Sequence, residues 1–244
     1  MRVTRCHVDL PLSAGAKITL PVSSAAHLVR VLRLREGDEC VLFNGDGNDY
    51  AACLALAGKR EVIADILSVS PVDNESPLRI TLIQGIARGE KMDLILQKAT
   101  ELGVAGFIPV LAERTEVKLD AERTEKRMLH WRSVIASACE QSGRARVPEL
   151  TQPIPLGHVT TKLVDDTVKF TLDPAGDLAL ATMATPTGHS VAIAIGPEGG
   201  WSRRDREILH AAGFSGLRLG PRVLRTETAG LAAIAALQSR FGDL

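Results

Sequence analysis

Apolar residues near the start of the chain fall in short runs that turns interrupt at frequent intervals. The pattern predicts strands at 17–22, 39–43, 50–56 and 62–69, and a brief helix at 26–32 that Ser23 or Ser24 could cap. Between two of these runs, Asn44-Gly45-Asp46-Gly47-Asn48 is a strong hairpin signal. Several short strands with frequent turns indicate a small β-barrel.

Beyond residue 78 the apolar runs alternate with helical patterns. Strands are predicted at 79–86, 107–111, 167–172, 191–195 and 217–219, and helices at 90–102, 121–141, 177–183, 202–213 and 227–241. This alternation is typical of an α/β fold, in which helices cover both faces of a mostly parallel sheet. The polar segment 70–77 contains two prolines and separates the two patterns, so we predict domains at 1–72 and 73–244.

Two loops of the second domain follow the ends of predicted strands. The first is Gly196-Pro197-Glu198-Gly199-Gly200, and the second runs from Gly220 to Ala229. Ligands of open α/β sheets bind outside the carboxyl ends of the strands, so the two loops are expected to be walls of one pocket. Neither loop carries the glycine pattern of a dinucleotide or ATP site. After the first loop, Ser202 and Asp205 form a predicted capping box for the next helix.

Basic residues gather in the same part of the chain. The whole sequence has 29 Lys plus Arg and 29 Asp plus Glu. The segment from Trp201 to Arg225, in contrast, contains six arginines and only two acidic residues, Asp205 and Glu207. A solvated surface and a surface that binds nucleic acid both explain this local excess. Thr226 and Glu227 have a structural interpretation, because they suit the cap and the first turn of the last helix.

The residues of these loops carry a family resemblance. IGPEGGWS, followed by LRLGPRVLRTETA, resembles the bacterial 16S ribosomal RNA (uracil-N3)-methyltransferase family of the SPOUT superfamily. Three further matching stretches are HLVRVLRLREGD at 27–38, RGEKMDLILQKATELGV at 88–104 and CEQSGRARVPE at 139–149. The resemblance implies a PUA-like RNA-binding barrel at 1–72 and a SPOUT methyltransferase domain with a trefoil knot at 73–244. It also implies S-adenosyl-L-methionine (AdoMet) as cofactor, 16S rRNA or the small ribosomal subunit as partner, and a homodimer.

The resemblance also assigns roles to individual residues. The cofactor-binding residues it implies are Leu172, Ile195, Gly196, Glu198, Gly199, Gly200, Leu219, Gly220, Leu224 and Thr226. The candidates for catalysis are Glu198, Arg225 and Glu227, and the candidates for RNA binding are Arg30, Arg33, Arg144, Arg146, Arg203 and Arg222. Loss of the N3 proton requires an acceptor within hydrogen-bond reach. Glu198 has an alternative role, since its carboxylate could brace its own loop by accepting backbone N–H groups.

Other functions agree with the same residues. A SPOUT ribose 2′-O-methyltransferase needs a similar pocket, and only the detailed LRTETA match favours base N3. A non-catalytic RNA-binding or ribosome-assembly protein could keep the fold and would bind RNA without AdoMet. A generic nucleotide-binding enzyme is disfavoured by the missing phosphate loop.

Composition limits further which kinds of core, binding surface and metal site the sequence can form. Aromatic residues make up 3% of the chain, so the core must be aliphatic and an aromatic RNA-stacking sheet is not expected. The four cysteines, Cys6, Cys40, Cys53 and Cys139, form no CxxC pair and are expected to be reduced thiols without a metal. The sequence shows no signal peptide and no apolar run of transmembrane length, so we expect a cytoplasmic protein.

Overall fold

The chain forms two compact units in the computed structural model, which describes residues 4–58, 61–117, 120–174, 176–180 and 183–244. One unit contains 1–75 together with 136–147, and the other contains 76–135 together with 148–244. Segment 136–147 thus belongs with the N-terminal part of the chain, which no sequence pattern indicated. The domain bounds 1–72 and 73–244 stay a prediction.

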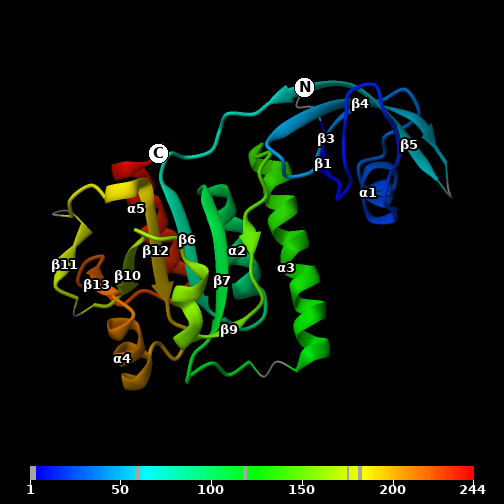
Figure 1. Ribbon diagram of the computed structural model, residues 1–244. Coiled ribbons are helices and arrows are strands. Elements are labelled where there is room, and N and C mark those ends of the chain that lie inside the picture. Colours follow the sequence, from blue (N-terminus) through cyan, green and yellow to red (C-terminus); the bar gives the residue numbers. More distant parts are fainter. Residues whose placement is uncertain (1–3, 59–60, 118–119, 175, 181–182) are drawn as a thin grey trace. The chain divides into compact units, whose positions relative to one another are not determined.

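The first unit is built on one twisted sheet. Its strands are β1 Arg5–His7, β2 Lys17–Thr19, β3 Glu39–Phe43, β4 Asn48–Ala57 and β5 Val62–Pro71, in the order β1-β3-β4-β5-β2 (Figure 1). The first half of β4 alternates buried and partly buried residues, as a strand with one face on a core does. The strands predicted at 39–43, 50–56 and 62–69 are confirmed, as is the hairpin that joins β3 to β4.

The short helix of this unit starts earlier than its sequence indicated. Helix α1 covers Val22–Ala26, and a π-helical turn, η1, continues it over His27–Val31. Pro21 occupies the N-cap position, and no side chain caps the helix. The prediction that Ser23 or Ser24 is the cap is therefore wrong. The Ser24 hydroxyl instead donates to the carbonyl of His7 on β1, at 3.1 Å, because Ser24 is buried against that strand.

A parallel sheet forms the centre of the second unit, as predicted. Its strands are β6 Arg79–Gly85, β7 Val104–Leu111, β8 Glu149–Leu150, β9 Ile154–Pro155, β10 Val168–Leu172, β11 Leu178–Ala179, β12 Ser190–Ile195 and β13 Ser215–Arg218. The order is β11-β13-β10-β12-β6-β7-β8, with β9 also paired to β7. Every ladder in the described part of this sheet is parallel, so the carboxyl ends of neighbouring strands meet at one edge.

Part of one predicted helix of this unit is a strand instead. In the segment 177–183, Leu178 and Ala179 form β11, whose partners on β13 are Leu217 and Arg218. The free edge of β13 offers backbone partners to an extended chain, and this tertiary pairing overrides the local helical pattern. Residues 181–182 of the predicted helix lie outside the described residues.

Helices cover both faces of the parallel sheet. The helices are α2 Glu90–Glu101, α3 Ala121–Ser142, α4 Arg203–Ala211 and α5 Thr226–Phe241, with 3-10 turns η2 at Leu156–Lys162 and η4 at Thr187–His189. In Figure 1, α2 and α5 lie behind the sheet, and η2 and α4 lie in front of it. No helix among the described residues combines the length and hydropathy that crossing a bilayer requires.

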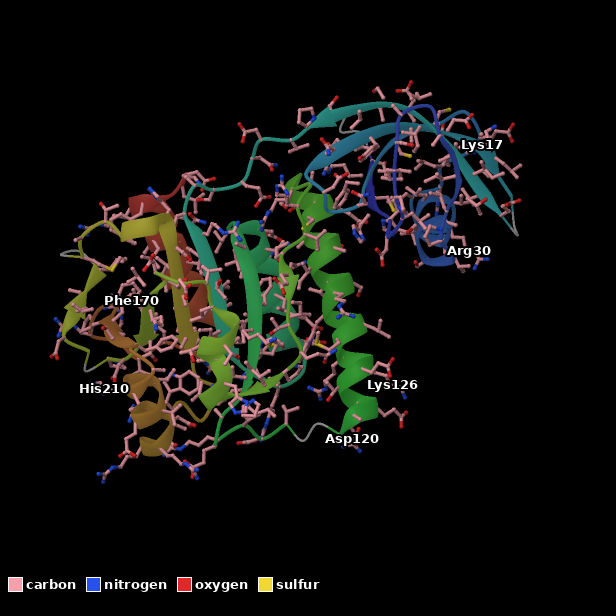
Figure 2. The ribbon with its side chains drawn as sticks, in the orientation of Figure 1. Lys17, Arg30, Asp120, Lys126, Phe170 and His210 are labelled. Atoms are coloured by element: carbon pink, nitrogen blue, oxygen red, sulfur yellow. The ribbon has the colours of Figure 1, made fainter. Side chains whose placement is uncertain are left out.

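Alternate residues of the central strands supply the two cores. Ala192 and Ala194 of β12 pack with Trp201 and Leu209 on the α4 side. On the other face a Cβ at Gly230 of α5 would lie 3.5 Å from Cγ1 of Ile195. In the stick view of Figure 2, Phe170 lies on β10, next to β12 in the sheet, and only 3% of its surface is exposed. Most of the buried side chains are aliphatic, as the low aromatic content predicted, and the few aromatic residues, such as Phe170 and Trp201, are buried among them. The trefoil knot stays a prediction.

The cysteines of the chain are free thiols, and three of them lie in the first unit's interior. Cys6, Cys40 and Cys139 are buried, and Cys53 is partly buried. Burial raises the pKa of the Cys139 thiol to about 12 and that of the Cys40 thiol to about 11. These thiols are therefore protonated and unreactive at neutral pH, which suits a packing role.

The start of α4 has the predicted capping box. The Ser202 hydroxyl accepts from the backbone N–H of Asp205 at 3.0 Å, and the Asp205 carboxylate accepts from the N–H of Ser202 at 3.0 Å. Both side chains are buried, so neither N–H could turn to water instead. The box fixes the point at which the chain leaves the first glycine loop.

We expect Ser202→Ala to lower the free energy of unfolding by about 1 kcal/mol, because it leaves the N–H of Asp205 without its acceptor. Urea denaturation followed by circular dichroism measures this. The matched control is Ser133→Ala within α3, whose exposed hydroxyl only donates back to the His130 carbonyl, and we expect a change within about 0.5 kcal/mol. Equal losses for the two variants would contradict the assignment.

Candidate functional site

A cavity of about 460 Å³ opens at the carboxyl ends of β10, β12 and β13. Its walls come from residues that follow those strand ends and from the start of α5. Of the predicted cofactor-binding residues, the cavity is lined by Leu172, Ile195, Gly196, Glu198, Gly200, Leu219, Gly220, Leu224 and Thr226. The parallel register places these loops together, which is the arrangement expected of a ligand site in an open α/β sheet.

The first glycine loop turns tightly and packs on itself. The backbone N–H of Gly200 donates to the Pro197 carbonyl at 2.8 Å, and Gly200 has a φ of +64°. A Cβ at Gly196 would lie 3.0 Å from the carbonyl carbon of Gly200, closer than side chains tolerate. Glycine at these positions lets the backbone itself form the wall of the cavity.

Gly199 is the one predicted cofactor-binding residue that does not line the cavity. A Cβ there would lie 3.1 Å from Cβ of Arg114, on the loop after β7. The Arg114 guanidinium also donates to the Gly199 carbonyl at 2.9 Å. Gly199 therefore gives the loop room to pack against Arg114.

Thr226 joins the two loops and does not cap α5. The N-cap residue is Arg225, and no side chain caps this helix. The Thr226 hydroxyl instead donates to the Gly196 carbonyl at 2.6 Å. The capping interpretation of Thr226 is therefore wrong, because the nearby first loop offers a carbonyl that local sequence does not reveal. Glu227 does lie in the first turn of α5, as predicted.

The Glu198 carboxylate is already engaged by the protein. Its Oε1 atom accepts from the backbone N–H of Arg88 at 3.0 Å and lies 3.3 Å from Nζ of Lys91. Burial by itself raises the pKa of this carboxyl, but the Arg88 N–H, the N–H of Glu198 itself and the Lys91 ammonium outweigh burial and hold it below the ordinary value. This geometry favours the bracing role, since a stabilised carboxylate is a weaker base.

The Glu227 carboxylate has the opposite situation. Its Oε2 atom is buried, and no donor among the described residues reaches it. The same side chain lines the cavity. A buried acceptor without a partner is costly, so this oxygen is the atom of the site most in need of a donor from a ligand.

Arginines at the cavity differ in whether they are paired. Arg206 lies 3.8 Å from the Asp173 carboxylate, and Arg203 on the outer surface of α4 lies 3.0 Å from Glu207. Arg222 and Arg225 are exposed, line the cavity and make no ion pair with any described residue. These two are the cations that remain available to a bound anion.

The sequence of both units matches known protein families. A family model described as an RNA methyltransferase domain matches residues 74–238, and one described as an RNA methyltransferase PUA domain matches residues 21–67. A ribosomal RNA small subunit methyltransferase E of Bacillus subtilis is 32% identical to this chain, over 86% of this chain and 85% of that protein. The chain belongs to the ribosomal RNA small subunit methyltransferase E family.

Solved structures agree with this family. The ribosomal RNA small subunit methyltransferase E of Neisseria gonorrhoeae, solved bound to S-adenosyl methionine, is 39% identical and superposes with a TM-score of 0.91 over 100% of both chains. A protein of Legionella pneumophila, described as a methyltransferase in complex with the cofactor SAM, is 39% identical with a TM-score of 0.94, also over 100% of both chains. The matches confirm the predicted family and the predicted fold class, a SPOUT-type α/β domain with a PUA-like domain before it.

Several of the predicted RNA-binding residues belong to the first unit. Arg30 and Arg33 are exposed, and Figure 2 shows Arg30 on the helical turn of that unit. Arg146 is also exposed. Arg144 differs, because only 4% of its surface is exposed and its guanidinium forms an ion pair with Glu75. An arginine held in this way offers little surface to RNA, so its interactions favour a structural role.

Sequence reasoning missed several residues of the site, among them Lys91, Arg114 and Trp201. Lys91 lines the cavity from the first turn of α2, and Arg114 holds the first loop from outside. Trp201 lines the cavity, and its indole N–H donates to the Thr171 hydroxyl at 2.9 Å. Lys91 and Arg114 both follow the carboxyl ends of strands, β6 and β7, and this rule would have identified them. Among the described residues no cluster of His, Cys, Asp and Glu could hold a metal ion.

The lowered pKa of Glu198 predicts a stability change that depends on pH. Because the folded pKa lies below the ordinary value of 4.5, the carboxylate stabilises the protein above about pH 4.5 and loses this effect as pH falls through the folded pKa. We expect Glu198→Gln to lower the free energy of unfolding at pH 7 by up to about 1 kcal/mol.

Urea denaturation of both proteins at pH 7 and at successively lower pH measures the difference, which should shrink below about pH 4.5. The control is Glu207→Gln, which removes an exposed partner of Arg203 and should have little effect at any pH. A difference for Glu198→Gln that does not vary with pH would contradict the bracing role.

Proposed function

We propose that this protein transfers a methyl group from AdoMet to N3 of a uridine in 16S rRNA. Family membership and the names of the relatives support the coarser part, AdoMet-dependent methylation of small-subunit rRNA. The observation that supports the finer part is that one cavity holds both a proton acceptor and a cation. The Glu227 Oε2 atom is buried without a donor among the described residues, and Arg225 makes no ion pair with any of them.

The residues around the cavity fit AdoMet. The side chains of Leu172, Ile195, Leu219 and Leu224 offer apolar walls to an adenine ring, and Gly196 offers bare backbone groups. A volume of about 460 Å³ lies in the usual range for small-molecule sites. When bound, AdoMet supplies a methyl group on a positively charged sulfur, which leaves as a neutral thioether. The protein's own contribution is to position the acceptor and to manage the proton.

Methylation at N3 forms an N–C bond and releases the N3 proton. Three carboxylates line the cavity, those of Asp173, Glu198 and Glu227. Asp173 lies 3.8 Å from Arg206, and Glu198 already has donors. We therefore assign proton acceptance to Glu227, whose Oε2 atom has none among the described residues. A general base must come within hydrogen-bond reach of the proton it removes, and the first turn of α5 places Glu227 on the cavity wall.

The two unpaired arginines have complementary roles in this proposal. Removal of the N3 proton places negative charge on the uracil oxygens, and Arg225, two residues before Glu227, supplies the positive charge that stabilises it. Arg222 suits a neighbouring phosphate, since guanidinium groups bind phosphate in a planar, bidentate geometry. Arg203 extends the same basic surface along α4.

Reaching N3 requires the uridine to leave its stack. The N3 edge of a paired base is covered by its partner, so the target must be presented in a loop or splayed out. We propose that Arg30, Arg33 and Arg146 of the first unit contact the RNA backbone, and that the protein acts as a homodimer. With zero net charge, binding rests on these local groups.

We expect the purified protein to incorporate labelled methyl groups from AdoMet into small ribosomal subunits that lack the modification. Digestion to nucleosides and mass spectrometry should show 3-methyluridine, because the LRTETA stretch at 224–229 resembles the uracil-N3 family. A 2′-O-methylated nucleoside would instead show that the enzyme methylates ribose. RNA binding without AdoMet binding would indicate a non-catalytic assembly protein.

Glu227→Gln keeps the shape of the side chain but cannot take a proton. We expect it to lower kcat by about 10²-fold or more, because general-base catalysis contributes that much. Single-turnover methylation with AdoMet in excess measures the effect, with Glu207→Gln as the control on the outer surface of α4. A larger loss for Glu198→Gln than for Glu227→Gln would reverse the assignment of the proton acceptor.

A further inference from the structure

Gln84 is a polar residue in an apolar part of the core. It lies near the end of β6, and only 1% of its surface is exposed. Strand alternation places it on the same sheet face as Leu82, toward α5, where a Cβ at Gly230 would lie 3.9 Å from its Oε1. Burying an amide costs free energy unless its hydrogen bonds are made, so its presence in this core needs an explanation.

The side-chain amide of Gln84 begins a chain of hydrogen bonds. Its Nε2 atom donates to the carbonyl of Gly85 at 2.8 Å and to the Thr226 hydroxyl at 3.0 Å. Since that hydroxyl accepts from Gln84, its single proton is directed to the Gly196 carbonyl, 2.6 Å away. The chain thus connects the end of β6, the start of α5 and the loop after β12.

The other two members of this series of hydrogen bonds, Thr226 and Gly196, line the cavity, and Gln84 itself does not. Thr226 directly precedes Glu227, so the orientation of the first turn of α5 also sets the position of that carboxylate. The backbone beside Gln84 has little room to adjust, because a Cβ at Gly85 would lie 2.6 Å from the backbone nitrogen of Pro197. An altered contact at Gln84 is therefore transmitted to the cavity walls.

A contribution to stability alone does not explain why the polar side chain of Gln84 is buried in an apolar core. Its Oε1 atom is buried, and no donor among the described residues reaches it. A buried amide with one end unpaired is less favourable than an apolar side chain of the same size. The benefit of the residue must then lie in what its Nε2 donor does.

We propose that Gln84 is a positioning residue for the cofactor site. By fixing the direction of the Thr226 hydroxyl, it holds the Gly196 carbonyl and the first turn of α5 in the arrangement that receives AdoMet. The inference rests on the proposed function, because it takes the cavity to be the AdoMet site.

The test measures AdoMet affinity by calorimetry and stability by urea denaturation in the same proteins. Gln84→Met keeps the side-chain volume without the amide, and Thr226→Val keeps the shape without the hydroxyl. We expect each to weaken AdoMet binding about tenfold, the size of one lost hydrogen bond to a buried group, while Gln84→Met leaves the free energy of unfolding unchanged or raises it. The double variant should bind no more weakly than Thr226→Val, because both changes break the same chain.

Controls separate positioning from general damage. Thr226→Ser restores the hydroxyl and should bind AdoMet nearly as well as the wild type. Thr100→Val removes a buried hydroxyl of α2 that donates to the carbonyl of Leu96, and because Thr100 does not line the cavity we expect AdoMet binding to stay unchanged.

Two outcomes would overturn the inference while leaving the proposed function intact. One is a Gln84→Met protein that binds AdoMet as the wild type does, and the other is additive losses in the double variant. If the wild type itself bound no AdoMet, the proposed function would fail and the inference would fail with it. Thr226→Val tests the same chain from its other end if Gln84→Met does not fold.

Discussion

The hydrogen bond from the Thr226 hydroxyl to the Gly196 carbonyl joins the two loops that form the cavity. Each loop follows a strand of the parallel sheet, but neither is held by the sheet itself once its strand has ended. Ordering a loop costs about 1–2 kcal/mol per residue, so loops without cross-links would sample many arrangements. The bond requires a hydroxyl side chain at the first position of α5 and a glycine where a Cβ would lie 3.0 Å from the carbonyl carbon of Gly200. This contact fixes the positions of the two loops relative to each other.

Two carboxylates of the cavity, those of Glu198 and Glu227, show how one fold gives similar groups different surroundings. Glu198 has an N–H donor and a cation beside it, so its negative charge is stabilised and its pKa is lowered. Glu227 keeps a buried oxygen with no donor among the described residues. The hydrogen bonds of the Glu198 carboxylate hold its loop in place, whereas the Oε2 atom of Glu227 can still accept a hydrogen bond from a substrate. Environment, and not residue type, assigns the roles.

Sequence predicted those features that depend on local or periodic patterns. The parallel sheet followed from alternating apolar runs and helices, and the Ser202–Asp205 box followed from spacing, because each partner lies within one helical turn. Thr226 has an equally good local pattern for a cap, yet its partner lies 30 residues away in sequence. The helix predicted at 177–183 was wrong at Leu178 and Ala179 for the same reason, because these residues pair with β13, which lies far along the chain. Gln84 had no visible signal, because a single polar residue in an apolar run does not reveal what it contacts.

The electrostatic character of the site likewise depends on pairing that composition cannot reveal. The chain carries no net charge, and the arginines near the cavity are numerous in sequence. The structure divides them: Arg206 lies beside Asp173, Arg203 lies beside Glu207, and Arg222 and Arg225 keep no carboxylate partner among the described residues. A paired arginine adds little field at a distance, because its partner cancels it. Among the arginines that line the cavity, Arg222 and Arg225 therefore contribute most to the local positive potential.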